Sequence, residues 1–191
     1  MIGMAQYYYS DRQIRTEDLV DGAVTPAKLS FGTWEKIGEV DVTSSVSSVS
    51  FTGLDGDSDK FYLLCCRIIN ADSANQRGFQ LRFNGDSGSN YSTEGFYVDG
   101  GSTSTKDISP DSQIEFCRVR AGDVGTALIF INPTTGKKRE IVSYFSGDRF
   151  VGIYGGAWTN TTDNVTSISV LQIGGAYIGA GSKFILFRVS T

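Results

Sequence analysis

The chain has 191 residues, which suits one domain of ordinary size with an extension, and 40% of the residues are hydrophobic. This composition predicts a substantial core and argues against wholesale disorder. The net charge is −4 and no block of lysine or arginine stands out, so we expect no nucleic-acid surface. No run approaches the roughly 20 apolar residues of a membrane span, and the start lacks a signal-peptide pattern, so we expect no membrane insertion.

Residues 1–15 are mostly polar and are interpreted as an N-terminal attachment arm. Tyrosine offers a large contact area with a polar tip, so tyrosines without a local core suggest a segment that orders on a partner. The alternative is an ordinary loose terminus. The candidate attachment residues are Tyr7, Tyr8, Tyr9 and Ile14.

Residues 16–33 form an amphipathic, proline-bearing segment that we interpret as an oligomerisation joint. The pattern indicates one helical half-turn after Thr16, a break at residues 21–22, and a second half-turn. Such short helical pieces are unstable alone, so packing against other copies of the chain would have to supply the missing stability. The residues expected in this contact are Leu19, Val20, Val24, Pro26 and Leu29.

Residues 34–191 carry β patterns almost throughout. Residues 46–54 alternate, with Val49 and Phe51 on one face. Residues 61–69 are nearly all apolar, as expected for a central strand covered on both faces. Glycine-rich residues 100–106 are predicted to be an exposed loop tip. Eight to ten short strands without a long helix predict an all-β domain, an antiparallel β-sandwich or jelly roll. The other stretches with a β pattern are residues 34–42, 79–83, 95–98, 114–119, 127–131, 139–145, 150–154, 165–173 and 183–189.

The three cysteines, Cys65, Cys66 and Cys117, do not suggest a disulfide framework, because their number is odd and two are adjacent. Neighbouring strand residues point to opposite faces, so at most one of Cys65 and Cys66 can readily meet Cys117. We expect buried free thiols, which suits synthesis in a reducing cytosol.

Histidine is absent, which removes Ser-His-Asp and Cys-His catalysis and imidazole metal sites. Asp55, Asp57 and Asp59 alternate and form a weak candidate for a hard cation such as Ca²⁺. Lys60 and Cys66 occupy loop positions that exclude an EF-hand, and a solvated turn explains the same residues. We therefore expect no resident metal and no other cofactor.

No pair of carboxylates stands out at the spacing that a glycosidase needs, so the chain is not expected to be an enzyme. Tyr154 and Trp158, beside a predicted loop over residues 155–162, are candidates for stacking against a glycan. The alternative is packing in a core or an interface, where aromatic side chains commonly lie.

Two stretches resemble bacteriophage virion appendage proteins. The segment LVDGAVTPAKL at residues 19–29 resembles a phrase, I-x-D-G-x-V-T-x-A-K-L, that recurs in tail-fibre and related proteins between an attachment segment and a distal β-domain. Trp34-Glu35, SVSSVSFTGLDGDSDKFYLL at residues 45–64 and LRFNGDSGSNY at residues 81–91 resemble a β-sandwich module of phage structural proteins.

The resemblance implies a non-enzymatic virion protein, made in the host cytoplasm and forming a homotrimer. Its arm and joint would dock on other virion proteins of the capsid or tail, and its β-domain would project outward. The absence of a long repetitive shaft favours a short appendage: a head fibre, a capsid decoration protein or a small tail protein. The alternative is a carbohydrate-binding tip that recognises a host cell-surface glycan.

Overall fold

The computed structural model describes residues 33–190 of the chain. The predicted arm and joint lie outside it, and so do their candidate residues Tyr7, Tyr8, Tyr9, Ile14, Leu19, Val20, Val24, Pro26 and Leu29. From Trp34 onward the chain forms one compact unit.

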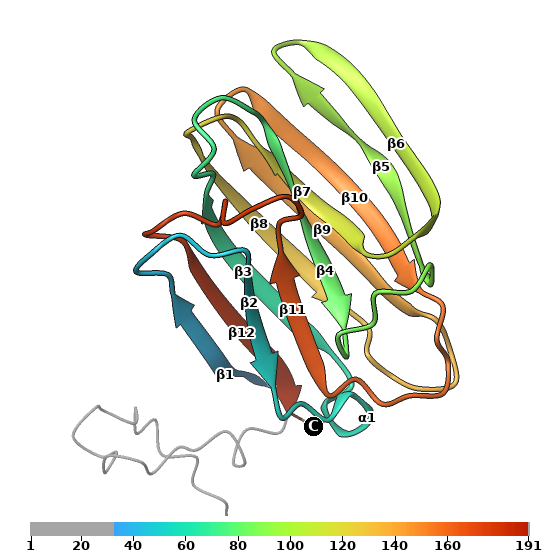
Figure 1. The fold of residues 1–191 in the computed structure, drawn as a ribbon. Helices are drawn as coiled ribbons and strands as arrows, with labels where there is room; N and C mark the ends of the chain where they lie inside the picture. Colours follow the sequence, from blue (N-terminus) through green and yellow to red (C-terminus); the bar gives the residue numbers. More distant parts are fainter. Residues whose placement is uncertain (1–32, 191) are drawn as a thin grey trace, which may run out of the picture. The chain divides into compact units, whose positions relative to one another are not determined.

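Twelve strands and one short helix, α1 (Gly56–Asp59), build the described domain, which confirms the all-β prediction (Figure 1). The eight-stranded sheet has the spatial order β1 (Thr33–Asp41), β12 (Lys183–Ser190), β3 (Tyr62–Ile69), β8 (Val124–Ile131), β9 (Arg139–Gly147), β10 (Phe150–Trp158), β5 (Tyr91–Asp99) and β6 (Ser102–Asp111). The four-stranded sheet has the order β2 (Ser48–Thr52), β11 (Ser167–Leu171), β4 (Arg77–Phe83) and β7 (Ile114–Val119).

The strand order is that of a jelly roll with two inserted hairpins. Without β5–β6 and β9–β10, eight strands remain, and they pair from the outside inward as β1 with β12, β2 with β11, β3 with β8 and β4 with β7. This nested pairing divides the strands over two facing sheets. Both inserted hairpins join the larger sheet and extend it beyond β8.

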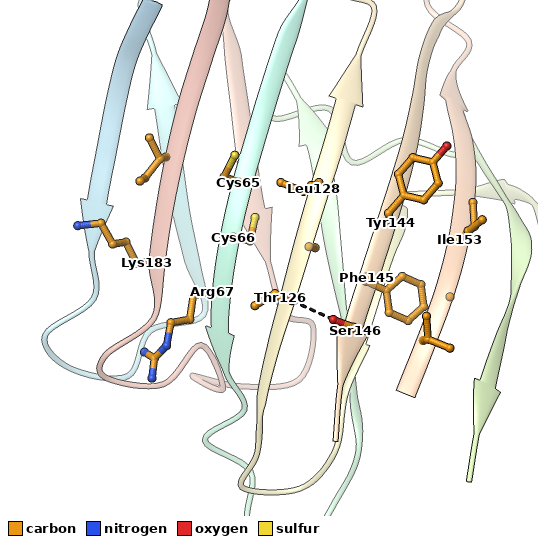
Figure 2. Close-up of a pocket in the computed structure, with 14 residues that line it drawn as sticks. Cys65, Cys66, Arg67, Thr126, Leu128, Tyr144, Phe145, Ser146, Ile153 and Lys183 are labelled. Carbon is orange, nitrogen blue, oxygen red and sulfur yellow. Dashed lines mark hydrogen bonds between the residues drawn. The ribbon is translucent and has the colours of Figure 1, made fainter. Parts of the chain in front are cut away.

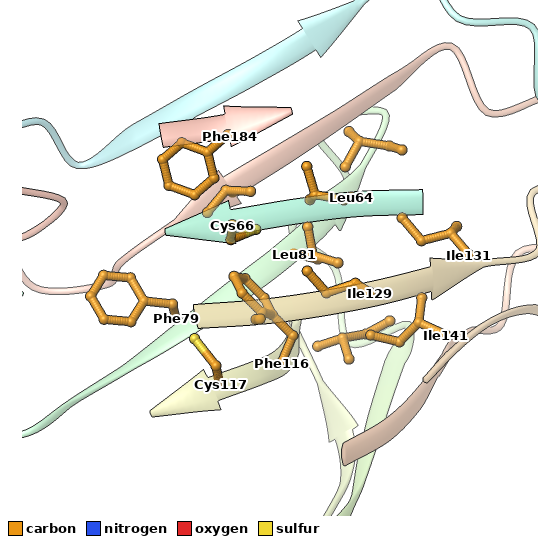
Figure 3. Packing of buried hydrophobic residues seen from close by; sticks show 14 of the residues in the cluster. Leu64, Cys66, Phe79, Leu81, Phe116, Cys117, Ile129, Ile131, Ile141 and Phe184 are labelled. Carbon is orange, nitrogen blue, oxygen red and sulfur yellow. The ribbon is translucent and has the colours of Figure 1, made fainter. Parts of the chain in front are cut away.

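The core lies between the two sheets, and alternate residues of most strands point into it. Figure 3 shows Leu64 and Ile129 of the eight-stranded sheet meeting Leu81 and Phe116 of the four-stranded sheet, and all four are fully buried. Burying one such side chain contributes roughly 1.5–3 kcal/mol, so the apolar alternation of the strands is the main source of stability.

Several expectations are confirmed and others are wrong. Val49 and Phe51 are buried together on one face of β2, as predicted. The segment at residues 100–106 is not a loop tip: only Gly100 and Gly101, both with positive φ, make the turn, and the rest belongs to β6, paired with β5. The predicted loop after residue 154 is also wrong at its start, because β10 continues to Trp158.

All three cysteines are free thiols. Cys66 and Cys117 are buried in the core, as predicted, and Cys65 is half-buried on the opposite face of β3. Burial raises the pKa of the Cys66 and Cys117 thiols well above the ordinary value, so we expect these two to be unreactive.

One end of the sandwich has an ion pair between β1 and β12, and the opposite end gathers four of the strand connections. Near the start of β1, Glu35 forms an ion pair with Arg188 at the end of β12. The opposite end, which we call the turn end, gathers the connections β3–β4, β5–β6, β7–β8 and β9–β10 (Figure 1). Backbone hydrogen bonds join them there, from the amide of Gly122 to the carbonyl of Asp72 and from the amide of Gly100 to the carbonyl of Arg149.

Candidate binding surfaces

The expectation that Tyr154 and Trp158 contact glycan is wrong. Both side chains are at most 1% exposed, because β10 turns them into the core. The Trp158 ring stacks on Phe83 with ring centroids 5.6 Å apart, and its Nε1 donates a hydrogen bond of 2.6 Å to Asp86. These rings hold the sandwich together and present no face to a ligand.

The three aspartates of the weak cation candidate each serve the fold instead. Asp55 caps the first turn of α1. Asp57 accepts hydrogen bonds from the backbone amide and the hydroxyl of Thr135, and these lower the pKa of Asp57 below its ordinary value. Asp59 is buried and accepts a 2.6 Å hydrogen bond from the Tyr62 hydroxyl. Within residues 33–190, no group of three or more histidine, cysteine or acidic residues is arranged to hold a metal ion.

The buried charges of the described domain are also engaged in structural contacts. Glu115, only 4% exposed, accepts hydrogen bonds from Lys106 and from Arg118 Nε. Arg139, fully buried, donates to the carbonyls of Asn160 and Asp163 and thereby fastens β9 to the β10–β11 connection. None of the helices in this part of the chain is long and apolar enough to span a membrane.

One surface feature is not explained by the fold: an apolar row on the outer face of the eight-stranded sheet. The registers place each member directly opposite the next on the neighbouring strand, across six strands. We call this row the apolar belt; its residues, in spatial order from β12 to β5, are Ile185, Cys65, Leu128, Tyr144, Ile153 and Phe96.

The belt is exposed to solvent in the described domain. Leu128, Tyr144 and Phe96 are 46%, 49% and 48% exposed, and the neighbouring Val151 is 57% exposed. Figure 2 shows Cys65, Leu128, Tyr144 and Ile153 along adjacent strands of this face, beside an open hollow of about 700 Å³. The outer face of a sandwich sheet is ordinarily polar, so an apolar row of this length indicates a binding surface.

A second, polar hollow of about 510 Å³ lies at the turn end. Arg120 lies over the Phe150 ring at 5.1 Å and forms an ion pair with Asp99. Two buried nitrogens at this hollow, Gln76 Nε2 and Arg120 Nε, have no hydrogen-bond partner among the described residues. Asp123 and Asp148 complete the polar lining.

Sequence reasoning missed both surfaces. The members of the belt come from six strands and lie up to 120 positions apart in the chain, from residue 65 to residue 185, so only the strand registers bring them into one row. The one available signal was that residues 61–69 are apolar at every position but one, which indicates that both faces of this strand have something to contact.

Comparisons with known proteins provide no family for the chain. No protein-family model matches it, and no curated protein matches it. Among solved structures, a crystal structure of a protein of unknown function from Shewanella oneidensis MR-1 is similar at 12% sequence identity, covering 85% of this chain and 78% of that chain, with a TM-score of 0.25. A likeness at that level carries no functional argument.

Proposed function

We propose that the chain is a bacteriophage virion structural protein, a short homotrimeric appendage of the head or tail. Its N-terminal arm attaches to other virion proteins, residues 16–33 join the copies, and the jelly-roll domain is displayed outside. The proposed joint contacts remain Leu19, Val20, Val24, Pro26 and Leu29.

One observation carries the proposal: residues 33–190 build an extended apolar binding surface, while their buried charged groups are used to hold the fold. A domain with this division is suited to assembly and display. The jelly roll adds support by analogy, since viral capsid proteins and lectins both use it. The resemblance of residues 19–29 to virion appendage proteins supplies the specific class.

The proposal is tested on purified particles of the phage that encodes the chain. We expect mass spectrometry to detect the protein in particles purified through a density gradient, and a gold-labelled antibody against residues 34–191 to mark one defined place on them. Particles that lack the protein, from cells that express it, would show that it is not a virion component.

The polar hollow at the turn end favours a second candidate, a tip that binds a host glycan. The carboxylates of Asp99, Asp123 and Asp148, with the guanidinium group of Arg120, match the hydroxyl groups of a sugar. The Gln76→Ala and Asp148→Ala variants test this candidate, because both side chains line the hollow. We expect saturable binding on a glycan array that both variants lose, whereas Asp107→Ala, an exposed carboxylate on β6, keeps it. No binding by the folded wild-type protein would remove this candidate.

A further inference from the structure

We propose that the apolar belt binds the same face of a second copy of this chain, sheet against sheet. This contact goes beyond the proposed function, because it uses the β-domain rather than residues 16–33 and does not depend on a place in a virion. The starting point is the row from Ile185 to Phe96, which contains no charged side chain across six strands.

The size of the face fits a specific contact between two proteins. Strands lie about 4.8 Å apart and alternate residues about 6.7 Å apart, so six strands by three rows cover roughly 600 Å² in plan. Side-chain relief raises the accessible surface above this value, towards the roughly 800 Å² that each partner contributes to a stable interface of standard size. The central row is the continuous apolar part of this face, and the flanking rows also contain charged side chains.

The face is also complementary to itself. A two-fold axis parallel to the strands and between β8 and β9 exchanges the two halves of the belt, three strands on each side. Leu128 then faces Tyr144 of the second copy, and the small Cys65 faces Ile153 of the second copy, by their positions in the registers. Sheets that pack face to face in this aligned way lie about 10 Å apart and interleave their side chains.

The rows on either side of the belt mix apolar and polar side chains: Glu94 ends one row, and Arg67 and Lys183 lie in the other. In the row next to the belt on the side of the β1 start, Leu63 and Gly155 lie at equal distances on opposite sides of the axis. The Leu63 side chain therefore faces Gly155 of the second copy, which has no side chain. In the row towards the turn end, the Thr126 and Ser146 hydroxyls hydrogen-bond to each other at 3.1 Å. Arg67 in that row donates a 2.6 Å hydrogen bond to the carbonyl of Gly181. An apolar centre with a polar rim is the usual anatomy of an interface.

The inserted hairpins explain why such a face exists. The four-stranded sheet needs only β1, β12, β3 and β8 opposite it to complete a jelly roll. The half of the belt on β9, β10 and β5 belongs to the insertions, and it continues the apolar row of β12, β3 and β8 without a break. The insertions therefore double the width of the outer face and create its two matching halves.

The test is the mass of the full-length protein, measured by light scattering after gel filtration over a range of concentrations. We expect the wild type to contain an even number of chains, six where the three-fold joint also forms, and Tyr144→Lys and Leu128→Lys each to halve the mass. Both residues are about half exposed, so a lysine at either position fits the single domain. The matched control is Thr52→Lys, which places the same charge on the exposed outer face of the four-stranded sheet and is expected to leave the mass unchanged.

Failure of this proposal is distinguishable from failure of the proposed function. A two-fold contact halves the mass when it is lost, whereas loss of a three-fold joint in Leu19→Asp reduces the mass to one third. A wild type that is a single chain at every concentration overturns the belt proposal and leaves residues 1–32 or another protein as the occupant. An unchanged mass in both folded lysine variants, with folding checked by circular dichroism, also overturns it.

The Cys65 thiol provides an independent readout. It lies in the belt, half-buried in the single domain, whereas the other two thiols lie in the core. We expect one thiol per chain to react with a small thiol reagent, several-fold faster in Tyr144→Lys than in the wild type, and Cys65→Ser to abolish this reaction. Equal rates in the wild type and Tyr144→Lys would contradict the proposal.

Discussion

The two faces of β3, β8 and β9 have nearly the same apolar character, yet they lie in opposite surroundings. On the inner face, Leu64, Ile129 and Phe145 pack against the four-stranded sheet and are at most 3% exposed. On the outer face, Leu128 and Tyr144 are nearly half exposed. Composition therefore does not tell the two faces apart; only the presence of the second sheet does.

This difference separates two uses of hydrophobic surface. Apolar groups on the inner face stabilise the single chain, since folding removes them from water. Apolar groups on the outer face contribute little to the stability of the single chain, because they stay in contact with water after folding. They contribute to the free energy of binding when another surface covers them. Substitutions at neighbouring positions on one strand should therefore have very different effects on the free energy of unfolding.

The largest effect is expected for Ile129→Ala on the inner face. Ile129 is fully buried, and truncation leaves a cavity between the sheets. Such substitutions cost about 2–5 kcal/mol. Urea unfolding followed by tryptophan fluorescence should show this loss, and a loss below about 1 kcal/mol would mean that the two sheets are not tightly packed at this position.

A somewhat smaller effect is expected for Glu115→Ala, which removes the anion between two cations. Lys106 and Arg118 would then lose their buried partner, and breaking a buried pair costs about 3–5 kcal/mol when it is fully enclosed. Because Arg118 is 28% exposed, water screens part of the penalty, and we expect a loss of about 2–3 kcal/mol. Exchange of the exposed Asp107 for alanine, on β6, is the matched control, with a change within about 0.5 kcal/mol.

The turn end should add a pH dependence of its own. The backbone amide of Ala74, aided by Arg77 and Asn75, holds the pKa of Asp72 at about 2, below its ordinary value of 3.8. A lowered folded-state pKa stabilises the protein above the ordinary pKa, and this contribution is lost as the pH falls from about 4 towards 2. The melting temperature of the wild type should exceed that of Asp72→Asn at pH 6, and the difference should shrink over that interval. A difference that is constant from pH 6 to pH 2 would contradict this assignment.

The smallest effect is expected for Leu128→Ala, directly beside Ile129 but on the outer face. In a Tyr144→Lys background, which separates the proposed pairs, it should change the free energy of unfolding by no more than about 0.5 kcal/mol. In the wild-type background it should instead weaken association. A destabilisation comparable to that of Ile129→Ala in the Tyr144→Lys background would show that the chain itself covers the outer face.

Much of the architecture was predictable because it depends on local patterns. Alternation placed Val49 and Phe51 in the core, and the frequent turn residues indicated many short strands. The apolar run at residues 61–69 correctly predicted an interior strand of the sheet; within the described domain only its inner face is covered, since Cys65 and its outer neighbours remain partly exposed. Alternation fixes which residues share a face and says nothing about what lies opposite it.

The candidate sites were less predictable, because they depend on distant parts of the chain. Tyr154 and Trp158 were predicted to lie beside or in a loop because the expected strand ended at residue 154. Pairing with β5 and β9 extends β10 to Trp158, and both side chains then point into the core. The aspartates of residues 55–59 had the ligand chemistry for a cation, but Thr135, 78 positions away, engages Asp57.

The sequence by itself determined a β-domain with a large apolar core, free cysteines and no histidine chemistry, because composition and period-two alternation are local properties of the chain. The tertiary structure alone decided the strand order, the depth at which each aromatic lies and the row from Ile185 to Phe96. These features arise from hydrogen-bonded registers between strands far apart in the chain, and a shift of one residue in any register would turn a different set of side chains outward.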